Sequence, residues 1–83
     1  MIYNCTDEQI HFLQTLKDWL ESTYQNVSFD TIGYGIEMKG STHQWMLLSD
    51  IITNIHSAIQ YKEYTPIQRH IFNSMRDRYI EKN

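Results

Sequence analysis

The sequence predicts an α+β fold of α-β-β-α-α order, with an N-terminal helix, an antiparallel β-hairpin or three-stranded sheet, and two C-terminal helices. Three observations predict it: helical apolar spacing in residues 7–24, two-residue alternation in residues 32–38, and helical spacing again after residue 50. The 83 residues are 41% hydrophobic and 13% aromatic, which is typical of a packed globule. We therefore expect residues 1–83 to form a single compact domain.

The first helix has a clear start signal. Thr6 and Gln9 have the spacing of a capping box, in which each side chain satisfies a backbone N–H of the other residue. A helix over residues 7–24 follows, with Phe12 and Trp19 on the flank of its apolar arc. The residues expected on that arc are Ile10, Leu13, Leu16, Leu20 and Tyr24.

The second pattern predicts a hairpin. Gly40 and Ser41 suit a two-residue type II′ turn, because glycine accepts the positive φ of its first central position. This turn places Ile36 opposite Trp45, and we expect Trp45 to lie in the core. Residues 27–29 are out of phase with residue 32, which indicates a bulge or turn between them and a third short strand as the alternative to a simple hairpin.

Two helices are expected in the C-terminal half. Ser49 or Asp50 is the predicted cap of a helix ending near residue 62; its isoleucines are β-branched, so a strand is the alternative. Thr65 before a proline, with a glutamine at the capping-box position, predicts a helix over residues 66–81. The apolar arc expected on this last helix comprises Ile67, Ile71, Phe72, Met75 and Tyr79.

Charge is divided along the chain. Residues 1–38 hold six acidic residues and one basic residue and stand at −5, whereas residues 39–83 hold six basic and four acidic residues and stand at +2. Acidic residues in a first helical turn and basic residues in a last turn serve the helix dipole. Asp18 and Glu21 on the first helix, and Arg69 and Arg76 on the last, are left as the charges that point to a partner.

The sequence contains no catalytic or cofactor-binding motif. Its four histidines have no zinc-ligand spacing with one another or with Cys5, the only cysteine. Cys5 precedes the first helix, whose positive dipole end could lower the thiol pKa and make the thiol reactive. A terminal thiol that is packed or frayed is the favoured interpretation, because the sequence offers no partner for it. We therefore expect a non-enzymatic protein with no cofactor and no metal.

The lone cysteine, the lack of a signal-like start and the lack of an apolar run near about 20 residues predict a cytoplasmic protein without a membrane partner. Our main hypothesis is that it binds a larger protein, for which a nucleic-acid-binding protein is one candidate, and modulates or inhibits this partner by occupying a site. Phages and mobile elements encode small inhibitors of this kind, some against host defence nucleases, although this is an analogy of size alone.

The expected partner-binding residues are Asp18, Trp19, Glu21, Asp30, Arg69 and Arg76. In the main hypothesis, the acidic residues meet a basic surface and Trp19 serves as an apolar anchor. In the alternative, the basic C-terminal helix binds nucleic acid directly as a small regulator. Homodimerisation of the acidic half with the basic half is a third hypothesis.

Overall fold

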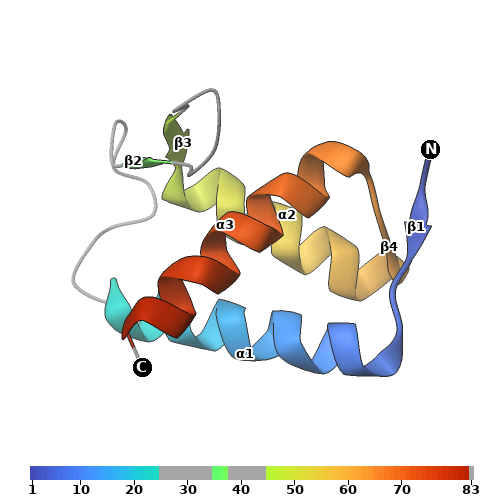
Figure 1. Cartoon of the computed structure of the whole chain (residues 1–83), viewed down its shortest axis with the longest axis horizontal. Helices are drawn as coiled ribbons and strands as arrows, with labels where there is room; N and C mark the ends of the chain where they lie inside the picture. The colour runs from blue at the N-terminus through green and yellow to red at the C-terminus, as the bar shows by residue number, and fades with distance from the viewer. Residues whose placement is uncertain (25–34, 38–44, 83) are drawn as a thin grey trace.

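The computed structural model describes residues 1–24, 35–37 and 45–82. This part of the chain contains three helices and two small antiparallel sheets, so the α+β class is confirmed, with one helix before the hairpin strands and two after them. The helices pack together, with β2 and β3 at one end of the molecule and β1 and β4 at the other (Figure 1). The elements are β1 (Tyr3–Asn4), α1 (Asp7–Thr23), β2 (Gly35–Glu37), β3 (Trp45–Leu47), α2 (Leu48–Tyr61), β4 (Glu63–Tyr64) and α3 (Pro66–Lys82).

Helix α1 starts with the predicted capping box. The backbone N–H of Gln9 donates to Thr6 Oγ1 over 3.1 Å, and the backbone N–H of Thr6 donates to Gln9 Oε1 over 2.9 Å. The helix ends at Thr23, and the N–H of Tyr24 donates to the carbonyl of Leu20. The leucines at positions 13, 16 and 20 are buried, as the helical spacing predicted.

Strands β2 and β3 form the predicted antiparallel pair, but the predicted register was wrong by one residue. Ile36 pairs with Met46 rather than with Trp45, and Trp45 pairs with Glu37. A one-residue slip moves every side chain of a strand to the other face. Trp45 is therefore 68% exposed instead of lying in the core, whereas Ile36 is buried. The turn at residues 40–41 and the third strand at residues 27–29 lie outside the described residues.

The reason for the slip lies at the junction of β3 with α2. Helix α2 begins at Leu48, directly after the strand, and Leu48 is buried. Side chains alternate between the two faces of a strand, so burial of Leu48 favours the phase in which Met46 is turned toward the core and Trp45 is turned away from it. The predicted cap at Ser49 or Asp50 was also wrong, because Leu47 is the N-cap and both residues lie in the first helical turn.

The isoleucine-rich segment is a helix and not a strand. Its helical spacing outweighs the β-propensity of isoleucine, because Ile51, Ile55 and Ala58 are all brought to one buried face. The helix ends at Tyr61, and the left-handed backbone of its C-cap, Lys62 (φ 58°), turns the chain into β4.

Helix α3 starts with a second capping box, as predicted. The backbone N–H of Gln68 donates to Thr65 Oγ1, and the backbone N–H of Thr65 donates to Gln68 Oε1. Phe72 is buried as expected, but Ile67 is 76% exposed, which corrects its assignment to the apolar arc. Ile67 lies in the first turn of α3, and its exposure shows that no described element covers this end of the apolar arc.

Strands β1 and β4 were not predicted, and they tie the N-terminus to the α2–α3 connection. Tyr3 pairs with Tyr64 and Asn4 with Glu63, and the two tyrosine rings stack with centroids 5.2 Å apart. The N–H of Cys5 extends the link by donating to the carbonyl of Lys62 over 2.8 Å. Each strand has two residues, too few for a periodic pattern in the sequence.

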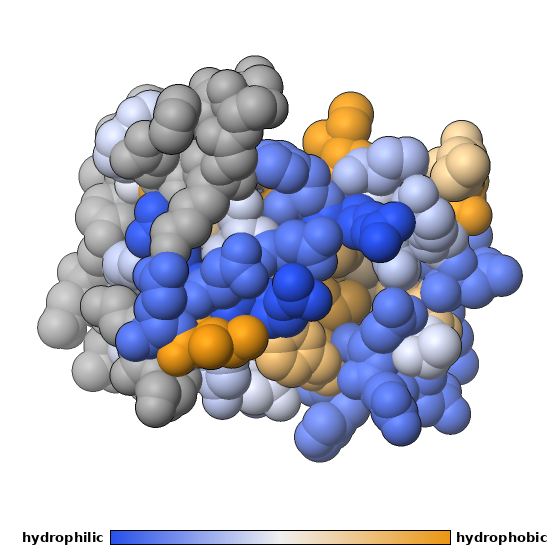
Figure 2. Space-filling view, viewed as in Figure 1, coloured by the Kyte–Doolittle hydropathy of each residue, from blue (hydrophilic) through white to orange (hydrophobic). Residues whose placement is uncertain are grey.

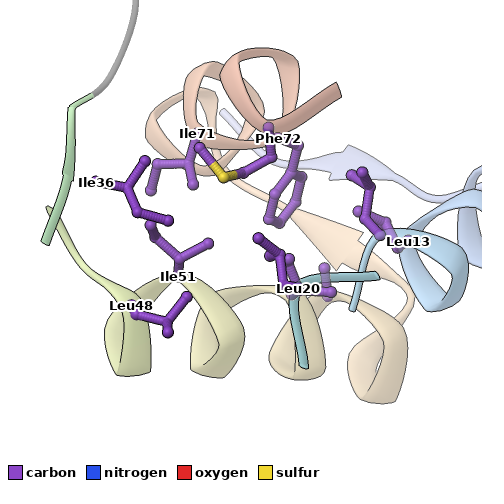
Figure 3. Packing of buried hydrophobic residues seen from close by; sticks show 11 residues of the cluster. Leu13, Leu20, Ile36, Leu48, Ile51, Ile71 and Phe72 are labelled. Atoms are coloured by element: carbon purple, nitrogen blue, oxygen red, sulfur yellow. The ribbon is translucent and has the colours of Figure 1, made fainter. Parts of the chain in front are cut away.

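The core lies between the helices and under β2. Side chains of α1, β2, α2 and α3 point toward one another, as shown by Leu20, Ile36, Ile51 and Phe72 (Figure 3). The buried core residues are Leu13, Leu16, Leu20, Ile36, Leu48, Ile51, Ile55, Ala58, Ile71, Phe72 and Met75. None of the helices in the described ranges is both long enough and apolar enough to span a membrane.

Candidate partner-binding groove

A groove of about 360 Å³ lies between the N-terminal half of α1 and α3. Apolar surface is visible between hydrophilic side chains on the face of the molecule that carries α3 (Figure 2). The apolar and aromatic groups of the lining come from both helices and from β4, and they are Phe12, Leu13, Tyr64 and Phe72. The polar and charged groups of the lining are Glu8, Gln9, Arg69, Asn73 and Arg76.

The groove owes its charge to one face of α3. Arg69 and Arg76 are seven residues apart, and Phe72 and Asn73 lie between them at the i+3 and i+4 positions of the same face. Seven residues of helix rise about 10.5 Å. Two guanidinium groups are thus carried two turns apart along the groove, with an aromatic ring and an amide between their positions.

The N-terminal strand holds Arg69. Its guanidinium carbon lies 5.2 Å from the centre of the Tyr3 ring, and its Nη1 donates to the Tyr3 hydroxyl over 3.4 Å. Tyr3 in turn stacks on Tyr64, whose ring meets Phe72 edge to face at 6.0 Å. The guanidinium is attracted by the face of the tyrosine ring, so β1 restricts the positions that Arg69 samples.

Arg76 is held only weakly. Its Nη2 lies 3.8 Å from Asp77 Oδ1, and half of each side chain is exposed. An exposed ion pair of this length contributes about 1 kcal/mol or less. Neither arginine forms an ion pair with Glu8, as far as the described residues show, and both keep guanidinium N–H groups for another acceptor.

Two of the acidic residues predicted as partner contacts, Asp18 and Glu21, lie away from this groove. Asp18 lines a second hollow between α1 and α2, together with Lys17 and His56. Glu21 forms a helical i, i+4 ion pair with Lys17, at 2.7 Å. Asp30 lies outside the described residues.

Trp19 is placed in the contact between α1 and α3 rather than on a free surface. Its ring meets Tyr79 edge to face with centroids 5.4 Å apart, and Phe12 meets the same tyrosine at 6.1 Å. Trp19 is partly buried and packs against the core. Of the five predicted contact residues that the structure describes, only Arg69 and Arg76 are therefore brought into one site.

Sequence reasoning missed Glu8, Gln9 and Tyr64 as groove residues. Gln9 Nε2 donates to the Tyr64 hydroxyl over 3.3 Å, which closes the groove at the β4 end. One signal was present in the sequence: the spacing of Arg69, Phe72 and Arg76 places an aromatic ring on the face that also carries the arginines. The contribution of β4 follows from a long-range pairing that no local pattern contains.

Cys5 and the histidines have simple placements. The Cys5 thiol lies 3.9 Å from the carbonyl of Ala58, and desolvation by burial raises its pKa. This placement agrees with the favoured interpretation of a packed thiol and not with the alternative of a thiol whose pKa is lowered by the helix dipole. His11, His56 and His70 are exposed. No group of three or more histidine, cysteine or acidic side chains that could hold a metal ion occurs within the described ranges.

No protein-family model matches the chain, and no relative was found among curated proteins or among solved structures.

Proposed function

We propose that this protein binds another protein through the groove between α1 and α3, and that it modulates this partner by covering the segment it binds. The observation that carries the proposal is the composition of the groove, in which an apolar floor is bordered by two arginines and by amide side chains. Aromatic residues and arginine are the residue types that most often dominate protein interfaces. An open hollow of this kind suits a partner's side chains, with the arginines supplying orientation.

The groove supports protein binding better than the acidic surface does. Glu21 is already engaged by Lys17, and Trp19 is engaged by Tyr79, so the anchor and one acidic contact of the original hypothesis have partners within the chain. Arg69 and Arg76, by contrast, border an open apolar surface. The proposed contact site therefore moves from the outer face of α1 to the groove.

Direct binding of nucleic acid is less well supported. Two arginines border the groove, but Glu8 lines it as well, and Asp77 follows Arg76 directly. Affinity for a phosphate backbone rises with the number of cations that displace counterions. A net charge of −3 for the chain also opposes association with a polyanion.

A photo-crosslinking amino acid at Asn73, which is exposed in the groove, tests the proposal in a lysate of the source organism. The matched control carries the same amino acid at Gln60, an exposed position on α2 that does not line the groove. We expect a protein adduct from position 73 that is absent from position 60 and is lost in the double variant Arg69→Glu/Arg76→Glu. A nucleic-acid adduct, or equal adducts from both positions, would refute the proposal.

A further inference from the structure

We infer that the groove takes an acidic segment of the partner, in which an apolar side chain lies between two carboxylates. This inference rests on the proposed function and specifies the chemistry of the occupant. It follows from three features of the groove: the apolar floor, the spacing of the two arginines, and the contacts that hold Arg69.

The floor selects an apolar side chain. Phe12 is partly buried and Phe72 is buried, and both already have aromatic partners in Tyr79 and Tyr64. Both rings line the groove, where an incoming apolar group would displace water without disturbing the core. The volume of about 360 Å³ is at the small end for a binding pocket, which suits one or two side chains better than a folded surface.

The two arginines select carboxylates. A guanidinium group matches the geometry of a carboxylate and binds it through two parallel N–H···O bonds. Positions 69 and 76 are separated by about 10.5 Å of helix rise, and a bound helix with acidic residues seven apart repeats this spacing. Its i+3 and i+4 side chains then lie on the same face, between the two acids, and meet the apolar floor.

Preorganisation favours Arg69 as the main contact. The Tyr3 ring and hydroxyl restrict its side chain before any partner arrives. A restricted side chain loses less rotamer freedom on binding than a free one does. Among the residues that the structure describes, the only ion pair of Arg76 is the exposed one with Asp77, so we expect Arg76 to contribute less to affinity than Arg69 does.

Glu8 is an acidic residue in the groove lining, so its effect on an acidic occupant is opposite to that of the arginines. Its carboxylate lines the groove in the first turn of α1, where the helix dipole favours a negative charge. An acidic occupant is repelled by this residue, whereas a basic occupant is attracted by it. Neutralising Glu8 should therefore strengthen the binding of an acidic segment.

The test measures fluorescence anisotropy of the full chain with a labelled helical peptide that carries two glutamates seven positions apart and a Leu-Phe pair between them. Three further probes are the same peptide with lysine at both acidic positions, the peptide with alanine in place of the Leu-Phe pair, and a single-stranded DNA oligonucleotide. We expect the acidic peptide to bind more tightly than every other probe.

The variants localise that binding. Arg69→Gln/Arg76→Gln should weaken the acidic peptide by about two- to fivefold for each arginine, and Glu8→Gln should strengthen it by about twofold. Lys17→Gln/Lys62→Gln removes the same total charge outside the groove and should change the affinity by less than about twofold. Circular dichroism and melting curves check that each variant is folded.

The inference is overturned if the lysine peptide binds as well as the acidic one, or if both double variants weaken binding equally. A protein adduct at position 73 without acidic-peptide binding leaves the proposed function standing and removes only the acidic occupant. Binding of DNA that exceeds peptide binding and depends on Arg69 and Arg76 overturns both.

Discussion

Trp45 and Cys5 are two residues whose chemistry depends on their exact surroundings. Trp45 lies on the exposed face of β3, and its ring packs close to Gly35 of β2. A Cβ added at Gly35 would lie 3.4 Å from this ring. Cys5 occupies a short link between β1 and α1, and its thiol is directed to the carbonyl of Ala58. Trp45 is exposed, although a tryptophan is on average expected to be largely buried. Cys5 is partly buried, which is usual for a cysteine.

We predict that Cys5 reacts slowly with a thiol reagent in the folded protein. Desolvation raises the pKa of the thiol above the ordinary value of 9.0, so less of the reactive thiolate is present at pH 8 than in the unfolded chain. The unfolded chain releases this proton more readily than the folded chain does. The stability contribution of Cys5 is therefore intact below about pH 9 and is lost as the pH rises above 9 through the raised pKa of the folded state.

The measurement compares the rate of thiol modification at pH 8 in buffer and in denaturing urea, with Cys5→Ser as the blank. We expect a lower rate in buffer and a steeper rise in that rate between pH 8 and pH 10. A folded protein that reacts faster than the denatured one would contradict the shielding of the thiol by burial.

The elements differ in how far local sequence determines them. The three helices were predictable because capping boxes at Thr6 and Thr65, and helical spacing in between, act within a few residues. The hairpin was predictable as a pair of strands, but its register depends on the burial of Leu48 and Ile36 against distant helices. Strands β1 and β4 were not predictable, since each has only two residues, too few to show a periodic pattern, and they pair across about 60 residues of sequence.

The same distinction explains the candidate site. Arg69 and Arg76 were identified because they share a helix face, which is a local property. The groove beside them needs Phe12 and Gln9 from α1 and Tyr64 from β4, and these residues meet only in the fold. Asp18 and Glu21 also share a helix face in the sequence, so they were predicted as contacts on the same grounds as the arginines. In the fold they lie on a side of α1 that does not line the groove.

We predict that the β1–β4 link stabilises the whole fold through Tyr3. Replacing Tyr3 with alanine removes the ring stack on Tyr64 and the contact with Arg69, at a cost of about 1–2 kcal/mol in the free energy of unfolding. Tyr3→Phe keeps both ring contacts and loses only the 3.4 Å hydrogen bond, so it should retain most of the stability.

Urea denaturation followed by far-ultraviolet circular dichroism measures these differences. Ile2→Ala is the matched control, because Ile2 adjoins Tyr3 and is 60% exposed, so its truncation should change stability by less than about 0.5 kcal/mol. If Tyr3→Ala proves as stable as Ile2→Ala, the β1–β4 link does not contribute to the stability of the fold.

At the scale of the whole molecule, one core joins all the larger elements. Its members come from α1, β2, α2 and α3, and several are fully buried. A chain of 83 residues is expected to unfold with a free energy of only about 4–12 kcal/mol. The groove is built on the outer edge of this core, because Phe72 and Leu13 belong to both. We therefore expect binding at the proposed site to depend on the core, and the core not to depend on the groove arginines.

We predict that damage to the core weakens binding at the groove, whereas loss of the groove arginines leaves the core stable. Leu16 is fully buried on α1, so Leu16→Ala should cost about 2–5 kcal/mol, which is a large fraction of the total and should reduce peptide binding by unfolding part of the population. Ile67→Ala, at a 76% exposed position of α3, should change stability by less than about 0.5 kcal/mol. Arg69→Gln/Arg76→Gln should leave the free energy of unfolding within about 1 kcal/mol of the parent value while weakening peptide binding. Urea titrations of these three variants, combined with anisotropy under conditions where each is folded, separate the effect on stability from the effect on binding.

A large loss of stability in the arginine variant would show that Arg69 and Arg76 stabilise the fold. The groove would then be a result of packing rather than a binding site.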